Sequence, residues 1–251
     1  MGDEEFRLVF QPIVHLDGED KLYGFEALIR WEHPTRGLIM PSDFIPLAEE
    51  TDRIMFLGMW ALRNACLAMA KFIKMHPKAG RLVMSVNLSA KQLVSTSLAV
   101  DILDVLELTG VPPAALNLEI TETTLMEGGS AAIARLKDLA DAGISFSIDD
   151  FGTGYSSMAY LSQLPLDNMK IDLSFVRMMD VNPNNIEIVR AIIQLAHSLG
   201  LEVVAEGVEK DVQRIKLMEL GCEYYQGYLF SMPLSFQEAG QLIVNQLEAE
   251  H

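Results

Sequence analysis

Polar side chains lie within or directly after several short apolar runs in this sequence. Most are carboxylates, one is an amide and one is the ammonium group of a lysine. Those that follow a run are, in chain order, Asn87, Glu119, Asp149, Asp150 and Glu206, whereas Glu26 and Lys170 lie within such runs. If the apolar runs are neighbouring strands of a closed barrel, their carboxyl ends meet at one mouth, where the chemistry of such barrels is located. The spacing therefore predicts one acidic site.

Several carboxylates at one mouth raise one another's pKa values and destabilise the fold unless cations neutralise them. Oxygen ligands suit Mg²⁺ or Mn²⁺, whereas zinc sites favour His and Cys. Each of the five histidines lies outside this set, so zinc is not expected. The adjacent pair Asp149 and Asp150 could serve two ions, an arrangement used for in-line attack on phosphodiesters.

The elements that must position these residues are short β-rich runs, most of them followed by helical patterns, which is typical of parallel βα units. About eight strands are expected, the number that closes a (β/α)8 barrel at this chain length. We expect their strand interiors to be apolar. The predicted strands are Arg7 to Val14, Lys21 to Arg30, Leu82 to Leu88, Leu116 to Ile120, Ser145 to Asp149, Asn168 to Asp172, Glu202 to Ala205 and Tyr224 to Tyr228.

The first two predicted strands adjoin through Asp17-Gly18-Glu19-Asp20, a turn too short to contain a helix. The first strand is therefore expected to run antiparallel to its neighbour. Predicted helices include Ile54 to Met75, Ser130 to Ala142, Ile186 to Leu199 and Phe236 to Glu248. The sequence contains no linker-like tract, so we expect a single domain over residues 1–251, excised from a longer multidomain protein.

Composition and charge narrow the functional classes. The chain has 251 residues, half of them apolar, and 35 acidic against 19 basic residues give a formal charge of −16. This balance argues against a nucleic-acid polymer or an anionic membrane as a partner, because both require clustered Lys and Arg. The charged residues within Ile54 to Met75 favour a core helix over a membrane span. Two distant cysteines indicate a cytoplasmic domain, and any membrane anchor would belong to segments outside this sequence.

Six motifs in order resemble the EAL domain, the bacterial cyclic di-GMP phosphodiesterase domain. They are Glu26-Ala27-Leu28-Ile29-Arg30, Asn87-Leu88-Ser89, Glu119-Ile120-Thr121-Glu122, Asp149-Asp150-Phe151-Gly152-Thr153-Gly154, Lys170-Ile171-Asp172 and Glu206-Gly207-Val208-Glu209. The resemblance implies a TIM-like barrel with an antiparallel first strand. It also implies hydrolysis of cyclic di-GMP to linear pGpG by a water that two metals, Mg²⁺ or Mn²⁺, activate.

The resemblance also implies roles for individual residues. Glu26, Asn87, Glu119 and Asp149 would bind one metal, and Asp149, Asp150 and Glu206 the second. Lys170 would hold or polarise the water, although Glu206 is also a candidate general base. Arg30 would contact a phosphate, and Gln11, Leu28, Glu209 and Gln226 would line the nucleotide pocket. The segment from Phe151 to Ser157 resembles a loop that gates metal binding and dimerisation, with Glu122 as its anchor. A homodimer and regulatory domains in the full-length chain are expected from the same resemblance.

Two alternatives remain open at this point. A catalytically silent cyclic di-GMP receptor would bind the nucleotide without turnover, although binding alone does not require a two-metal site. A barrel aldolase would use Lys170 as a Schiff-base amine. Carboxylates around that lysine argue against the aldolase, because they raise the pKa of the amine.

Overall fold

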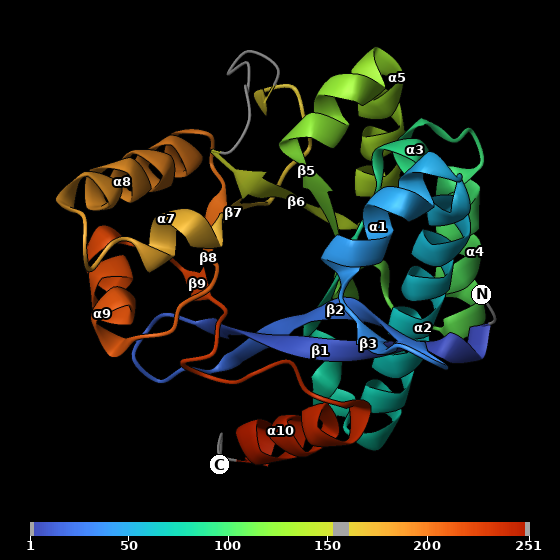
Figure 1. Cartoon of the computed structure of the whole chain (residues 1–251), viewed down its shortest axis with the longest axis horizontal. Helices are drawn as coiled ribbons and strands as arrows, with labels where there is room; N and C mark the ends of the chain where they lie inside the picture. Colours follow the sequence, from blue (N-terminus) through green and yellow to red (C-terminus); the bar gives the residue numbers. More distant parts are fainter. Residues whose placement is uncertain (1–2, 153–160, 249–251) are drawn as a thin grey trace.

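The computed structural model describes residues 3–152 and 161–248, and its centre is a closed barrel of eight strands with helices around it (Figure 1). A ninth strand, β3, extends β2 as a hairpin outside the barrel. The strands are β1 (Phe6–His15), β2 (Leu22–His33), β3 (Gly37–Ile39), β4 (Val83–Asn87), β5 (Leu116–Thr121), β6 (Ser145–Phe151), β7 (Asn168–Ile171), β8 (Glu202–Ala205) and β9 (Tyr224–Tyr225).

The strand order confirms the predicted topology. The sheet runs β1-β9-β8-β7-β6-β5-β4-β2-β3, and a β1–β2 pairing closes it. β1 is antiparallel to both β2 and β9, whereas the pairings from β2 through β4 to β9 are parallel. The β1–β2 connection is the short turn expected from the sequence. The fold is therefore a TIM-like barrel with an antiparallel first strand.

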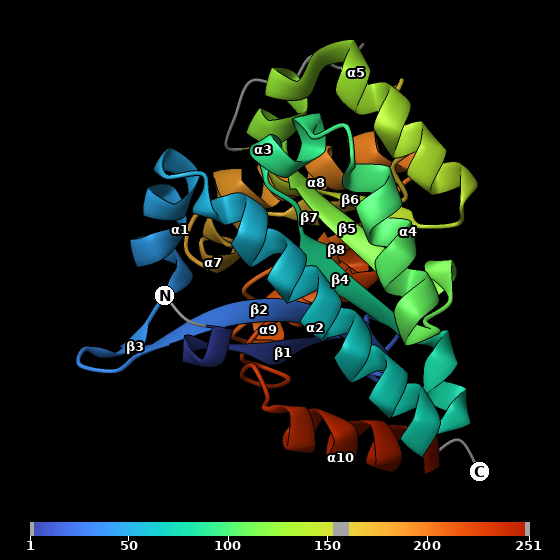
Figure 2. The same ribbon diagram turned by 90° about the vertical axis from the view of Figure 1, so that its right-hand side faces the viewer.

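The helices described in the structure lie on the outside of this barrel (Figures 1 and 2). Short 3-10 helices cover Asp3–Glu5, Pro77–Arg81 and Pro113–Ala115. The α-helices are α1 (Pro41–Glu50), α2 (Arg53–Met75), α3 (Ala90–Val94), α4 (Leu98–Thr109), α5 (Glu122–Asp141), α7 (Leu173–Arg177), α8 (Pro183–Ser198), α9 (Asp211–Leu220) and α10 (Phe236–Glu248).

The C-terminal helix α10 covers the strand that has no crossover helix of its own. Because β1 and β2 are joined by a turn, no helix between them can shield β1. Figure 2 shows α10 beneath β1, although the two are at opposite ends of the sequence. Phe236 stacks on Phe72 of α2 with ring centroids 4.8 Å apart, and Phe10 of β1 meets both rings edge-on. Burial of these large apolar rings attaches the end of the chain to its beginning.

Helix α2 is, within residues 3–152 and 161–248, the single helix long and apolar enough to cross a membrane by length and composition. One face of it, including Leu57, Ala65 and Met69, is buried in the protein. It packs against α1, α4 and β4. This packing is the behaviour predicted for a core helix.

Several predicted elements differ in extent from the structure. The strand predicted over Tyr224 to Tyr228 ends at Tyr225. Gly227 then packs its backbone against that of Val208, where an added Cβ would be 2.2 Å from the Val208 carbonyl oxygen. The helix predicted from Ser130 begins earlier, at Glu122, and Gly129 interrupts it with φ of 57°. The strand predicted to end at Arg30 continues to His33 and folds back as β3.

The expectation of apolar strand interiors is wrong for β4, β5 and β6 on the side that faces the barrel axis. Ser85, Asn117 and Ser147 are buried there and bond one another across β4, β5 and β6. Apolar neighbours such as Leu118 and Phe146 join the main core cluster, which includes helix residues. Side chains alternate between the two faces of a strand, so the apolar half of each run packs outward against the helices.

Candidate active site

Seven strands bring the predicted polar residues together at one mouth of the barrel. Glu26 lies in β2, Asn87 ends β4, Glu119 lies in β5 and Lys170 in β7. Glu206 and Gln226 directly follow β8 and β9, and Asp149 and Asp150 lie near the end of β6. The residues of this set that lie within strands point their side chains to the inside of the barrel. Residues from distant parts of the sequence therefore meet there.

Lys170 is the centre of this cluster. Its Nζ lies 2.7 Å from Glu119 Oε2 and 2.7 Å from Glu206 Oε1. The same nitrogen is 3.2 Å from Asp149 Oδ1 and 3.3 Å from Glu26 Oε2, and the lysine side chain is 1% exposed. One buried cation thus contacts four carboxylates from four different strand ends.

Two amide side chains add hydrogen bonds to the same carboxylates. Gln226 Nε2 donates to Glu26 Oε2 at 2.8 Å and to Glu206 Oε1 at 2.9 Å. Asn87 Nδ2 donates to the other oxygen of Glu26 at 2.9 Å. Gln226 Oε1 is buried and has no hydrogen-bond partner within the described part of the chain. Both amide hydrogens of Gln226 are therefore directed at predicted metal ligands. The sequence predicted only that Gln226 lines the nucleotide pocket and did not predict these contacts.

A β-bulge in β6 places the two adjacent aspartates. Ile148 pairs with Met169 and Phe151 pairs with Ile171, so Asp149 and Asp150 together stand opposite the single residue Lys170. Asp150 has φ of 53°, in the left-handed region that side chains other than Gly rarely adopt. Its backbone N–H donates to Asp149 Oδ1 at 3.0 Å. Bulges and such backbone conformations occur next to functional sites, where they redirect side chains.

The proton affinities of these groups reflect their burial. Burial raises the pKa of Glu206 to about 8, and it raises the pKa of Glu119 well above its ordinary value. Burial also acts to raise the pKa of Glu26, but Lys170, Gln226 and Asn87 favour its charged form, so that this pKa is lowered. The pKa of Asp150 rises to about 6 because of burial and the neighbouring Asp149.

Lys170 has a pKa well above that of a free lysine. Burial alone would lower it, but the surrounding carboxylates outweigh burial and stabilise the ammonium form. A Schiff-base amine must be available unprotonated. The structure thus removes the support for the aldolase alternative.

The residues present fit a divalent metal site. Asp149, Asp150 and Glu206 each offer a ligand oxygen, and these oxygens all lie within 4.8 Å of one another. Carboxylate and amide oxygens without histidine or cysteine form the donor set that hard cations such as Mg²⁺ and Mn²⁺ prefer. The surplus of carboxylates over the single lysine supplies the negative charge that such an ion would balance.

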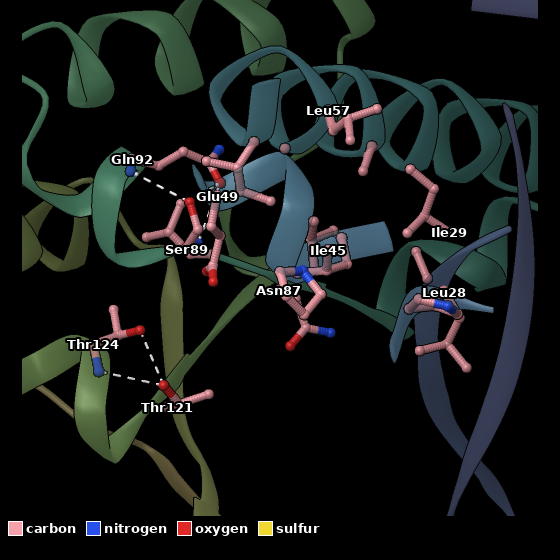
Figure 3. A pocket seen from close by; sticks show the side chains of 18 of the residues that line it. Leu28, Ile29, Ile45, Glu49, Leu57, Asn87, Ser89, Gln92, Thr121 and Thr124 are labelled. Carbon is pink, nitrogen blue, oxygen red and sulfur yellow. Dashed lines mark hydrogen bonds between the residues drawn. The ribbon is translucent and has the colours of Figure 1, made fainter. Parts of the chain in front are cut away.

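An apolar pocket adjoins the acidic cluster. It has a volume of about 460 Å³ and lies between α1, α2 and the ends of β2 and β4. Figure 3 shows Leu28, Ile45 and Leu57 on its walls, together with Asn87. Asn87 connects the pocket to the cluster, because its side chain donates to Glu26. Leu28, predicted to line a nucleotide pocket, therefore lines a cavity of suitable apolar character next to the predicted metal ligands.

The other predicted contacts lie around the mouth and have partners of their own. Arg30 Nη1 donates to its neighbour's carbonyl, Ile29 O, at 2.9 Å, and Gln11 Nε2 donates to Ser231 O at 3.0 Å. Glu209 is exposed on the loop after β8, where its Oε1 accepts from Arg177 Nη2 at 2.8 Å. These residues surround the cluster without joining it.

Part of the predicted gating loop cannot be compared with the structure. Residues 153–160 lie outside the described residues, and these include most of the segment from Phe151 to Ser157. Its predicted anchor, Glu122, is the first residue of α5 and is buried, and its Oε1 has no hydrogen-bond partner among the described residues.

Two residues near the site were missed at the sequence level. Asp172 directly follows β7, and its charge contributes to the raised pKa of Asp150. That position after a strand was a usable signal. Arg177, the partner of Glu209, lies in a short helix and carried no comparable signal.

Comparisons with known proteins agree with this geometry. The family model described as EAL domain matches residues 1–233. The cyclic di-GMP phosphodiesterase NbdA of Pseudomonas aeruginosa is 46% identical over 237 residues, which are 93% of this chain and 30% of NbdA. The chain spans about a third of the length of the curated relatives it matches.

Solved structures show the same fold. The MucR phosphodiesterase of P. aeruginosa, in complex with cyclic di-GMP, superposes with a TM-score of 0.89 at 38% identity, covering 94% of each chain. BlrP1 of Klebsiella pneumoniae, in a complex with manganese and cyclic di-GMP, gives a TM-score of 0.79 at 28% identity. That match covers 92% of this chain and 56% of BlrP1.

Proposed function

The chain belongs to the EAL domain family, and we propose that it is a metal-dependent phosphodiesterase that hydrolyses cyclic di-GMP to linear pGpG. The relatives named for this activity and the solved complexes with cyclic di-GMP support the substrate. The observation that carries the proposal is the cluster of carboxylates around Lys170 at the barrel mouth.

Charge balance supports two divalent ions at this mouth. The cluster contains five carboxylates and one ammonium group, which leaves four negative charges in excess when all are ionised. Two divalent cations carry four positive charges and would neutralise that excess. We propose Mg²⁺ or Mn²⁺ as the ions, and the manganese complex of BlrP1 supports this choice.

The ligands are proposed to divide into two sets that share one aspartate. Glu26, Asn87, Glu119 and Asp149 would hold one ion, and Asp149, Asp150 and Glu206 the other. The proximity of Asp149, Asp150 and Glu206 supports the second set. When bound, such ions activate the attacking water and neutralise charge on the phosphoryl oxygens.

Lys170 is proposed to act as a fixed cation that orients the water and stabilises developing negative charge. Its contacts with four carboxylates and its raised pKa keep it protonated, so it cannot accept a proton. Glu206 remains the candidate for the general base, because its carboxylate lies 2.7 Å from Lys170 Nζ, beside the proposed position of the water. The charge state of Lys170 thus favours Glu206 as the base.

The substrate is proposed to lie across the mouth. The apolar pocket beside Leu28 can accept a purine base, and Arg30 is suited to a phosphate because a guanidinium donates two parallel hydrogen bonds. Gln11 and Glu209 border the same opening on other sides. A homodimer, regulatory domains in the full-length chain and a cytoplasmic location belong to the same proposal.

The test is an assay of the purified protein with cyclic di-GMP and Mg²⁺ or Mn²⁺, with the products separated by chromatography. We expect pGpG from the wild type and none from Glu26→Ala. Glu219→Ala is the control, because Glu219 lies on α9 outside the barrel and pairs with Lys216 at the surface. Full activity of Glu26→Ala would refute the metal assignment, and tight nucleotide binding without product would favour a silent receptor.

A further inference from the structure

A layer of small polar side chains lies inside the barrel, below the acidic cluster. Asn117 Nδ2 donates to Ser85 Oγ at 2.9 Å and to Ser147 Oγ at 2.9 Å. Ser147 Oγ in turn lies 3.1 Å from Asn117 Oδ1 and can donate to it. Each of the three residues is 2% exposed. We call Ser85, Asn117 and Ser147 the polar triad.

Each member of the polar triad precedes a predicted metal ligand by two residues on the same strand. Ser85 precedes Asn87 in β4, Asn117 precedes Glu119 in β5, and Ser147 precedes Asp149 in β6. Residues two apart in a strand point to the same face and are separated by about 7 Å. The polar triad is thus the layer directly beneath three ligands that the proposed function assigns to one ion.

The composition of this layer is unusual for its position. The inside of such a barrel is ordinarily filled by branched apolar side chains, which pack without directional constraint. Hydrogen bonds are directional. A buried donor or acceptor that loses its partner costs free energy, so buried hydrogen bonds favour one arrangement of their groups. The amide of Asn117 therefore adds side-chain hydrogen bonds to the backbone pairing of β5 with β4 and β6, a directional constraint that apolar packing would not supply.

Metal ligands need such fixed spacing. Divalent ions such as Mg²⁺ require near-ideal geometry, so a small lateral shift of one strand would move one ligand oxygen out of range. Asn87, Glu119 and Asp149 come from three separate strands, and local structure in any one strand cannot set the distances among them. Hydrogen bonds across those same three strands can.

We propose that the polar triad consists of positioning residues that hold Asn87, Glu119 and Asp149 in register for metal binding. This inference rests on the proposed metal site. It assigns a role to three residues that neither contact the ion nor reach the substrate. Removal of the polar triad is expected to weaken metal binding by about 10-fold, the low end of the range found when groups that hydrogen-bond directly to metal ligands are removed.

The experiment replaces the polar triad with apolar side chains of similar size, in the variant Ser85→Ala/Asn117→Leu/Ser147→Ala. Replacing all partners of a buried hydrogen-bond set leaves stability nearly unchanged or raised, so a merely structural role predicts normal metal binding. Binding of Mn²⁺ to the metal-free protein is measured by isothermal titration calorimetry, and unfolding temperature is measured in parallel. We expect weaker Mn²⁺ binding at a near-normal unfolding temperature, with turnover recovered at high Mn²⁺.

A pair of single variants keeps the test decisive if the triple variant does not fold. Ser147→Ala removes a member of the polar triad, whereas Ser145→Ala removes a hydroxyl in the same strand that bonds the Leu116 carbonyl instead. We expect Ser147→Ala to bind Mn²⁺ more weakly than the wild type, and Ser145→Ala to bind it with the affinity of the wild type. Equal Mn²⁺ affinity in both variants and the wild type would overturn this inference and leave the proposed function intact. A wild type that binds no Mn²⁺ would overturn the proposed metal site itself.

Discussion

Replacement of Lys170 by methionine removes the single cation that contacts the acidic cluster among the described residues. Methionine has similar length and no charge, so the change tests charge more than volume. Four carboxylates would then face one another around an apolar group, each within 3.3 Å of the lost nitrogen's position. We expect the metal-free variant to be clearly less stable than the wild type.

The size of the loss follows from burial. Removing one partner of a buried ion pair costs about 3 to 5 kcal/mol, because the remaining charge is left uncompensated. For a chain of this size each kcal/mol lowers the unfolding temperature by roughly 2 to 4 °C. The expected decrease is therefore about 6 to 20 °C at pH 8 without metal.

The loss must depend on pH in one direction. A carboxyl group with a raised folded pKa, such as Glu206 at about 8, contributes stability below its unfolded pKa that is lost as the pH rises through the folded value. Without the lysine these pKa values rise further. The difference between wild type and variant should therefore be small at pH 5 and large at pH 8.

The assay is thermal unfolding of both metal-free proteins at pH 5 and pH 8, followed by circular dichroism. Lys216→Met is the control, because Lys216 pairs with Glu219 at the surface, where ion pairs contribute little. Added Mg²⁺ should recover part of the stability at pH 8. An equal loss at both pH values, or no loss, would show that Lys170 does not neutralise the cluster.

Two further predictions concern protons and the loop after β8. Metal binding at pH 7 should release protons, because the raised pKa of Glu206 keeps this side chain partly protonated until an ion displaces the proton. The release is measured by titration calorimetry in buffers of different ionisation heat. Binding heats that do not vary with the buffer would contradict this prediction. Arg177→Gln should raise KM for cyclic di-GMP several-fold with little change in kcat, because it frees Glu209 from its partner. The matched change Arg190→Gln, at a surface pair with Glu187, should leave KM unaltered, and equal effects of the two would refute the positioning of Glu209.

The sequence was sufficient to predict the barrel and the location of its mouth. The short Asp17 to Asp20 turn predicted the antiparallel start, and polar residues after apolar runs located the strand ends. Both signals are local, since turn length and strand ends are determined by neighbouring residues. Such signals can therefore be interpreted from the sequence without knowing how the rest of the chain folds.

Other features depend on register, which local patterns do not reveal. The bulge that places Asp149 and Asp150 opposite Lys170 exists only in the pairing of β6 with β7. The sequence also did not reveal that the side chains of Ser85, Asn117 and Ser147 point into the barrel, because each of them lies within a run that is apolar on average. Pairing across strands also decides that both amide hydrogens of Gln226 reach carboxylates.

The most direct test of the proposed activity is hydrolysis of cyclic di-GMP by the purified protein during a titration of Mg²⁺ or Mn²⁺. The acidic cluster around Lys170 predicts no product in chelator, pGpG formation that rises and saturates with the metal, and no product from Glu26→Ala at any metal concentration. Hydrolysis that persists in excess chelator, or its absence at every concentration of both metals, would contradict the account.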